Sequence, residues 1–277
     1  MTLKHHITKT LGPKAAYLVT TLYERGRTIF RLKDVGKVLG LDKNASINFV
    51  RKLVNRGVVT RLKPGLFILV PFELGRESDY LGEPSIVARE IVAGRGYYLS
   101  HGTAMEIHHM VTQPQLVVTT SVLKPRRPVR VLGTQFQFIR TPQKYFFGIM
   151  KHWMTKREKI RVSDLEKTVI DGLRQPEYCG GLTEVAKGLW MQRQSLNPKR
   201  LIEYAKKTEV GSVIRRLGFL LELYQIGQDK DRDALREILT DTYLRLDPSL
   251  PAEGKFLRRW RLQLNVSQEE LLAVVRT

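Results

Sequence analysis

Two short helical patterns joined by a glycine-containing turn constrain the fold of this chain most. In the first pattern, apolar residues recur at helical spacing at Leu32, Val35, Val38 and Leu39. Gly40 follows, and glycine readily adopts the left-handed conformation that ends many helices. Asp42 can cap the next helix by accepting a hydrogen bond from its free N–H groups. The apolar stripe of this second helix is predicted at Ile47, Val50, Leu53 and Val54, with Gly57 after its end.

Two β-rich runs after this helix pair predict a hairpin. Residues 58–62 and 66–70 are rich in β-branched and apolar side chains, and Lys63-Pro64-Gly65 between them is a turn signal. An upstream helix is predicted over residues 13–25, which begin with proline, a residue suited to the first helical turn. We therefore expect a winged helix-turn-helix domain over residues 1–76.

Positive charge is concentrated in this amino-terminal part of the chain. The 277 residues carry a formal net charge of +20 and have a pI near 10.2. Residues 1–76 contain 15 Lys and Arg but only 4 Asp and Glu, a net charge of +11, and no acidic residue occurs between Lys43 and Lys63. Such a surface attracts polyanions, so double-stranded DNA is the expected partner of this helix-turn-helix.

The second helix and the hairpin supply the candidate DNA-binding residues. Amide and hydroxyl side chains can hydrogen-bond base edges, and cationic side chains neutralise phosphates. The candidates for base contact are Asn44, Ser46 and Asn48. The candidates for phosphate contact are Lys43, Arg51, Lys52, Arg61 and Lys63. A solvated basic face that serves protein contacts is the alternative explanation of the same residues.

Composition argues against several other classes of protein. The single cysteine, Cys179, excludes an intramolecular disulfide and a cysteine-rich zinc site. The start of the chain lacks the apolar core of a signal peptide, and no apolar run approaches the ~20 residues that span a bilayer. We therefore expect a cytoplasmic protein with no membrane partner.

The remaining residues, 77–277, predict a larger mixed α/β domain. Strands are expected in its first half, among them residues 144–150, and helices dominate the second half. Ser163 or Asp164 can cap the first of these helices, and Glu166 lies three residues after Ser163, as in a capping box. A last strand is expected over residues 259–264. The predicted fold class is therefore α+β, with a small sheet and a helical carboxyl-terminal part.

Residue combinations for enzyme chemistry are weak. His101, beside Ser100, completes no zinc or nucleophile motif, and a helix cap followed by surface histidines explains it. The carboxylates that could imitate the metal site of a nuclease are Asp164, Glu166, Asp171, Glu177 and Glu184. Helix-dipole stabilisation and a pairing of Asp171 with Lys167 account for them better. We expect no enzymatic activity, no cofactor and no metal, with a metal-dependent nuclease as the alternative.

Arg215 and Arg216 lie in a strongly apolar helical stretch that runs from Val210 to Glu222. Arginine is enriched at partner surfaces, so this pair is a candidate partner-binding site. A core helix whose arginines are solvated is an equally open alternative.

Taken together, these motifs resemble the AbiEi antitoxin family of type IV toxin–antitoxin systems. The resemblance is carried by the amino-terminal helix pair, Tyr98 to Ala104, Ser163 to Asp171, Pro176 to Gly181, and Arg215 to Gly218. It implies an autorepressor that binds inverted repeats upstream of its own operon, as a homodimer on the DNA, and that counters a nucleotidyltransferase-like toxin. A ligand-responsive repressor without a toxin partner is the remaining alternative.

Overall fold

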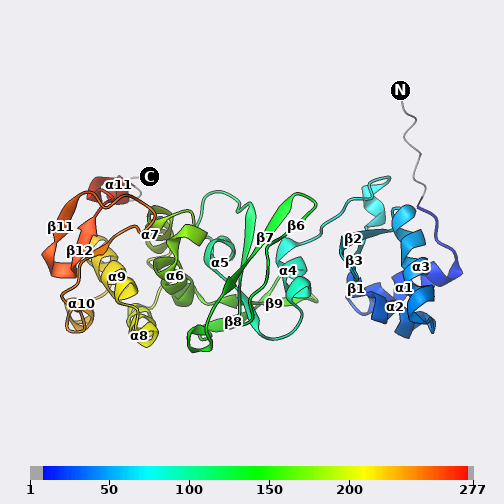
Figure 1. Ribbon diagram of the computed structural model, residues 1–277, viewed down its shortest axis with the longest axis horizontal. Helices are drawn as coiled ribbons and strands as arrows, with labels where there is room; N and C mark the ends of the chain where they lie inside the picture. Colours follow the sequence, from blue (N-terminus) through cyan, green and yellow to red (C-terminus); the bar gives the residue numbers. More distant parts are fainter. Residues whose placement is uncertain (1–8, 274–277) are drawn as a thin grey trace, which may run out of the picture. The chain divides into compact units, whose positions relative to one another are not determined.

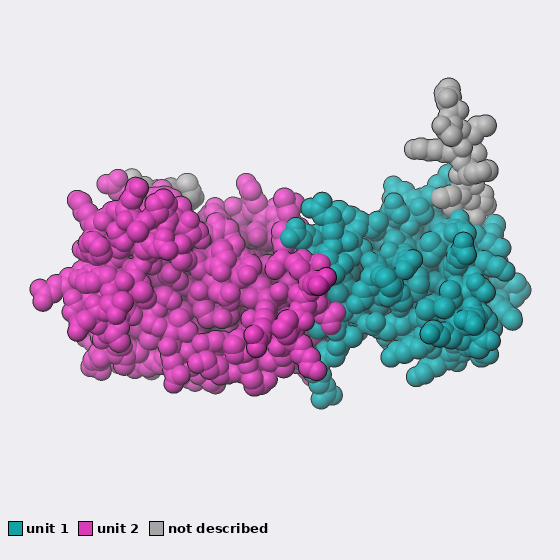
Figure 2. All heavy atoms as spheres, in the orientation of Figure 1, with its two compact units in different colours: residues 1–95, 129–136, 153–160 teal, residues 96–128, 137–152, 161–277 magenta. Residues whose placement is uncertain are grey.

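The computed structural model describes residues 9–273, and the chain divides into two compact units (Figure 1, Figure 2). Unit 1 comprises residues 1–95, 129–136 and 153–160, and unit 2 comprises residues 96–128, 137–152 and 161–277. Unit 1 thus extends past residue 76 and takes in two short segments from the middle of the chain. The class is α+β. Every helix within the described residues is too short or too polar to span a bilayer.

Unit 1 begins with three helices and a three-stranded antiparallel sheet. These elements are α1 (Pro13–Glu24), β1 (Ile29–Arg31), α2 (Leu32–Leu39), α3 (Lys43–Asn55), β2 (Val59–Lys63) and β3 (Leu66–Leu69). The strand order is β1-β3-β2, with Phe30 opposite Phe67. The three helices and the hairpin that the sequence predicts are confirmed, whereas β1 was not predicted because three residues are too few to show a period. The 3-10 helix η1 (Phe72–Leu74) and α4 (Pro84–Val92) follow.

One apolar cluster joins the three helices to this sheet. Its members are Ala15, Leu18, Val19, Leu22, Phe30, Val35, Val50, Leu53, Val58, Val59, Phe67 and Leu69. The Phe30 and Phe67 rings stack with their centroids 5.9 Å apart. Between α2 and α3, Gly40 has a φ of +65°, and the Asp42 carboxylate accepts a hydrogen bond from the Ala45 backbone at 2.8 Å. The glycine stop and the aspartate cap predicted for this turn are therefore confirmed.

Unit 2 contains most of a six-stranded sheet. The elements of this part of the chain are β4 (Tyr97–Leu99), α5 (His101–Ile107), β5 (Val117–Val122), β6 (Val129–Val131), β7 (Thr134–Arg140), η2 (Gln143–Tyr145), β8 (Ile149–Trp153) and β9 (Lys159–Ser163). The strand order is β6-β7-β5-β4-β9-β8. The short strand β4 pairs antiparallel with β5 and parallel with β9, so it lies inside the sheet, and all three of its residues are buried.

Helices fill the rest of unit 2. They and the strands among them are α6 (Leu165–Arg174), η3 (Pro176–Tyr178), α7 (Leu182–Met191), α8 (Pro198–Thr208), α9 (Gly211–Leu223), α10 (Asp229–Arg236), β10 (Leu244–Arg245), β11 (Lys255–Leu257), η4 (Arg258–Trp260), β12 (Leu262–Leu264) and α11 (Gln268–Ala273). Helix α6 packs against α7, α8 and α9. Helix α9 also packs closely against η4. A Cβ on Gly218 of α9 would lie only 2.0 Å from Cζ3 of the buried Trp260, so only glycine fits at this position.

Two predicted strands in this unit are wrong in their bounds. Residues 144–150 begin instead in the 3-10 helix η2, which follows Pro142, and the strand starts only at Ile149. Proline cannot donate to a sheet ladder, and it favours a turn at this point. Residues 259–264 are likewise split, since η4 occupies the first two and β12 the last three.

Of the two caps predicted for α6, Asp164 is confirmed, whereas Ser163 with its capping box is wrong. Asp164 is the cap, and its carboxylate accepts a hydrogen bond from the Lys167 backbone at 2.8 Å. Ser163 is buried one residue earlier, with its hydroxyl 2.7 Å from the Thr168 hydroxyl. A carboxylate is the stronger acceptor at a helix N-terminus, where it is also favoured by the helix dipole.

A buried polar cluster lies between β4, α5 and α6 of unit 2. Lys167 and Asp171 form a fully buried ion pair, and the Tyr98 hydroxyl donates to Asp171 at 3.0 Å. His101 is fully buried as well, with Nδ1 2.9 Å from the Ser100 hydroxyl, so the expected surface position of this histidine is wrong. Burial lowers the pKa of His101 to about 4, opposed by nearby Asp171. The ring is therefore neutral at pH 7.

The neutral state of His101 predicts a pH dependence of stability. Its folded-state pKa lies below the ordinary value of 6.5, so unfolding takes up a proton between pH 6.5 and 4. The contribution of the neutral ring is fully present above pH 6.5 and is lost as the pH falls toward 4, by at most about 1.4 kcal/mol per pH unit. We expect urea denaturation to show this slope in the natural chain and a reduced slope in His101→Asn.

Asparagine is the matched replacement because His101 has a φ of +51°, a left-handed conformation that asparagine tolerates. An identical slope in both proteins would contradict the assignment of this pH dependence to His101.

Candidate nucleic-acid interface

Helix α3 presents a polar face to solvent. Asn44, Asn48 and Arg51 are spaced by four and three residues, so they share one side of the helix, and all three are exposed. Lys43 and Lys52 are exposed as well. All five of these candidates for DNA contact therefore lie at the surface. This face occupies the first turns of α3, where recognition helices carry the residues that contact base edges.

Four cations of α3 and β2 have no acidic partner among the described residues. Among residues 9–273, the side chains of Lys43, Arg51, Lys52 and Arg61 make no hydrogen bond and no ion pair. Arg61 occupies the exposed position in the middle of β2. Unpaired surface cations of this kind can neutralise phosphates and release the counterions condensed on a duplex.

Ser46 is buried, which corrects its assignment to base contact. Its side chain is only 1% exposed and faces α2. A Cβ on Gly36 of α2 would lie 3.5 Å from the Ser46 Oγ and 2.9 Å from the Leu41 carbonyl oxygen. The two helices therefore approach each other where both have small residues, and Ser46 cannot reach DNA. Within the described part of the chain, its hydroxyl has no hydrogen-bond partner.

Ile47 is exposed, which corrects the predicted apolar stripe of α3. It is 40% exposed, whereas Val50 and Leu53 are each 1% exposed. The buried stripe runs through Ser46, Val50 and Leu53, with Phe49 packed beside it. The buried face of α3 was predicted incorrectly because it includes a serine. A helical wheel that allows a small polar residue on the buried face predicts the observed orientation of the helix.

Lys63 is held within unit 1, which corrects its assignment to phosphate contact. It is half-buried, and its Nζ donates a hydrogen bond to the Ile91 carbonyl oxygen at 2.9 Å. That oxygen is among the last carbonyls of α4, which have no partner within the helix and are favoured sites for cations. The ammonium group therefore completes the end of a helix.

Arg215 and Arg216 lie in the interior of unit 2, which corrects their assignment to partner binding. They are 2% and 4% exposed. The carbonyl acceptors of Arg215 are those of Gly211, Thr240 and Thr242. The carbonyl acceptors of Arg216 are those of Leu173, Arg245 and Leu246. Burial lowers the pKa of Arg216 to about 10, so it remains charged at pH 7. Its hydrogen bonds connect α9 to two other backbone segments.

Three of the five acidic residues considered for a metal site serve local structure. Asp164 caps α6 and accepts a hydrogen bond from the Tyr204 hydroxyl at 2.9 Å. Glu166 accepts one from the Asn197 backbone at 2.8 Å, and Asp171 belongs to the buried polar cluster. In residues 9–273, no three His, Cys, Asp or Glu side chains gather as ligands of a metal ion would.

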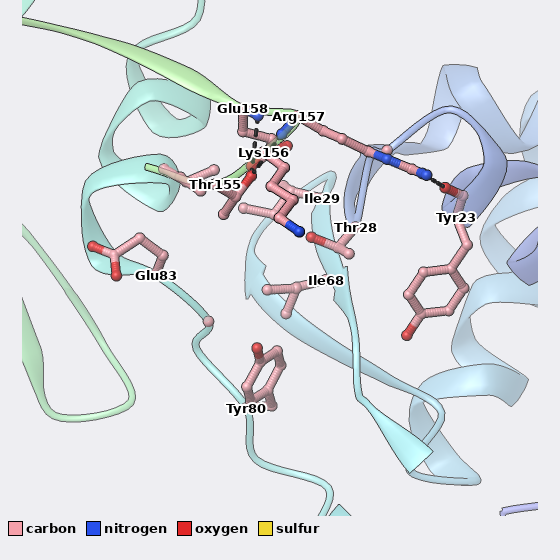
Figure 3. Close-up of a pocket in the computed structure, with 13 residues that line it drawn as sticks. Tyr23, Thr28, Ile29, Ile68, Tyr80, Glu83, Thr155, Lys156, Arg157 and Glu158 are labelled. Carbon is pink, nitrogen blue, oxygen red and sulfur yellow. Dashed lines mark hydrogen bonds between the residues drawn. The ribbon is translucent and has the colours of Figure 1, made fainter. Parts of the chain in front are cut away.

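A pocket of about 470 Å³ forms a second candidate site within unit 1 (Figure 3). Its apolar part includes Ile29, Ile68 and Ile86, and its aromatic part consists of Tyr23 and Tyr80. The loop over residues 155–158 supplies polar groups to the same pocket.

Two basic residues of this loop differ in what they contact. Arg157 donates from Nη1 to the Tyr23 carbonyl oxygen at 3.0 Å, at the carboxyl-terminal end of α1. Lys156 is exposed and, within residues 9–273, has no hydrogen-bond or ion-pair partner. Figure 3 shows its side chain reaching toward Thr28. The pocket therefore combines apolar walls with the two cations Lys156 and Arg157 and with two carboxylates, of which Glu158 pairs with Arg89 and Glu83 caps α4.

The burial of Ser46 predicts an unusual substitution effect. A buried hydroxyl without a partner carries a desolvation cost of about 1–3 kcal/mol, and alanine is the better helix former. We expect Ser46→Ala to raise the free energy of unfolding by roughly 1 kcal/mol in urea denaturation. The larger Ser46→Val should lower it by about 1–3 kcal/mol, because the helices cannot separate without loss of packing. A destabilised alanine variant would show that the hydroxyl is hydrogen-bonded.

Comparisons with known proteins identify the fold of this chain but no family. No protein-family model and no curated protein matches it. Among solved structures, the chain is similar to the crystal structure of the RV2827C protein from Mycobacterium tuberculosis, with a TM-score of 0.69 and 15% sequence identity. The match covers 99% of this chain and 98% of that chain. The two proteins therefore share their α+β fold over nearly their whole length.

Proposed function

We propose that this chain is a DNA-binding transcriptional repressor whose helix α3 enters the major groove of the duplex. The element order α1-β1-α2-α3-β2-β3, with the antiparallel sheet order β1-β3-β2, supports a winged helix. In this assignment α2 and α3 form the helix-turn-helix, and the β2–β3 hairpin is the wing.

The composition of the exposed face of α3 carries the proposal. Asn44 and Asn48 can each make paired hydrogen bonds to adenine, and Arg51 can make them to guanine. Lys43 and Lys52 beside them are unpaired within the described residues and suit phosphates. A surface for protein contacts is expected to have aromatic and aliphatic side chains at its centre. Here amides and a guanidinium surround a single aliphatic residue, Ile47, and no aromatic side chain of α3 is exposed, which favours a nucleic acid.

We extend the proposal to an AbiEi-type role, in which the chain represses its own operon in the cytoplasm as the antitoxin of a type IV toxin–antitoxin pair. The order of the sequence motifs supports this extension. Two copies would bind an inverted repeat, because half-sites related by a dyad require a symmetric protein. Expression of an adjacent nucleotidyltransferase-like gene should arrest growth, and co-expression of this chain should restore it. If growth stays arrested, the antitoxin role is excluded and only the proposed role as a repressor remains.

Base contact and phosphate contact predict different effects of substitution. We expect Asn48→Ala to weaken binding to the DNA upstream of the gene by ~1–3 kcal/mol and to relax preference at one base pair. Fluorescence anisotropy with duplexes altered one base pair at a time measures both effects. Unchanged affinity and unchanged preference would argue against α3 as the recognition helix.

Lys52 and Lys63 form a matched pair for the phosphate contacts. Lys52 is exposed and unpaired within the described residues, whereas Lys63 is hydrogen-bonded to Ile91. We expect Lys52→Ala to weaken binding to all sequences and to lower the slope of log K against log salt by about 1. Lys63→Ala should leave the slope unchanged. The opposite outcome would place the duplex on the hairpin and not on α3.

The pocket in unit 1 favours a second candidate function, a repressor that responds to a small molecule. Its apolar walls and the unpaired Lys156 suit an apolar body that carries a negative charge. Benzoate is the simplest probe of this chemistry. It should raise the melting temperature of the natural chain and of Lys151→Glu, which changes an exposed lysine outside the pocket. It should not raise that of Lys156→Glu, and equal shifts in all three proteins would exclude the pocket.

A further inference from the structure

Ile47 is an apolar side chain on the DNA-facing side of α3. The other large apolar residues of this helix, Phe49, Val50, Leu53 and Val54, belong to the core cluster of unit 1 or pack against it. Ile47 is 40% exposed and is not part of that cluster. Burial in unit 1 therefore does not account for an isoleucine at this position.

The position of Ile47 along α3 sets what it can contact. It lies three residues after Asn44 and four before Arg51, so all three side chains are neighbours on the helix surface. In the proposed function Asn44 and Arg51 contact base edges, and the side chain between them would enter the groove with them. At the floor of the major groove, the apolar group that a base presents is the C5-methyl of thymine.

We infer that Ile47 is a specificity-determining residue that contacts the C5-methyl group of a thymine in each half-site. The inference rests on the proposed function and adds the identity of one base in the DNA that the chain would recognise. Asparagine suits adenine, arginine suits guanine and isoleucine suits thymine, so the half-site beneath α3 contains a thymine within the span of bases read by Asn44 and Arg51. The contact is a dry one between two apolar groups.

The size of the effect follows from the burial of one methyl group. Removing a carbon of this size from water contributes about 0.8 kcal/mol, which corresponds to a roughly fourfold change in affinity for each α3 on the DNA. Replacing thymine by uracil removes only that methyl and leaves the hydrogen-bonding edge of the base unchanged. Uracil substitution is therefore a specific probe for Ile47.

The experiment uses the full-length chain and a duplex chosen by selection from a random library. Each thymine of the selected duplex is replaced in turn by deoxyuridine, and affinity is measured by anisotropy at fixed salt concentration. The natural chain should lose about fourfold in affinity at one thymine of each half-site. Ile47→Ala should bind the thymine and uracil forms equally at that position. Because Ile47 is exposed and alanine favours helices, the variant should fold, which circular dichroism checks.

Phe72→Ala supplies the matched control, since Phe72 is another exposed apolar residue of unit 1, 44% exposed, and lies outside α3. This variant should keep the discrimination between thymine and uracil. Equal binding of both bases by the natural chain at every position would overturn the role of Ile47 while leaving DNA binding intact. Failure to bind any duplex would overturn the proposed function and this inference together. Discrimination that survives in Ile47→Ala would assign the methyl contact to another residue.

Discussion

The close crossing of α2 and α3 is the constraint on which the proposed interface depends. Gly36 has no room for a side chain, because a Cβ there would lie 2.9 Å from the Leu41 carbonyl oxygen. Ser46 faces it from α3 with its small side chain buried. A helix turned to bury Ser46 must expose the opposite side, which holds Asn44, Asn48 and Arg51. The packing between two small residues thus decides which side chains meet a ligand.

Unit 2 contains charged side chains in its interior, and each of them has hydrogen-bond partners. Arg216 lies in α9 and donates to three carbonyl oxygens on two separate segments, so its guanidinium replaces hydrogen bonds that water would otherwise provide. Lys167 instead has a carboxylate partner in Asp171 and a tyrosine beside it. Removing Asp171 would leave the buried charge of Lys167 uncompensated, and removing Arg216 would leave buried carbonyl oxygens without donors; both changes are destabilising. These groups therefore stabilise the unit, although the sequence suggested that the arginines bind a partner.

Local signals predicted most elements, whereas long-range partners escaped prediction. Gly40 and Asp42 placed the turn between α2 and α3 because a glycine stop and an aspartate cap act within a few residues. The side chains of Lys63 and Arg216 donate hydrogen bonds to carbonyl groups 28 to 43 residues away, and no local sequence pattern reveals such partners. Ser46 is buried and Ile47 is exposed, which is the reverse of what the sequence predicted. A small polar residue can be buried where helices cross, and an apolar residue can remain outside.

The contact between Arg157 and α1 has a consequence for how unit 1 can be inherited or transplanted. The Tyr23 carbonyl at the end of α1 accepts a hydrogen bond from the Gly26 backbone and a second one from Arg157, 134 positions later in the chain. Gly26 leaves room for the Arg157 side chain, because a Cβ would lie 2.9 Å from its Cδ. Unit 1 is therefore not formed by one continuous stretch of the sequence. Recombination that joined the first 95 residues to a foreign carboxyl-terminal half would lose this second hydrogen bond and the packing of Arg157 on Gly26, so unit 1 would keep both only if the distant loop were transferred with it.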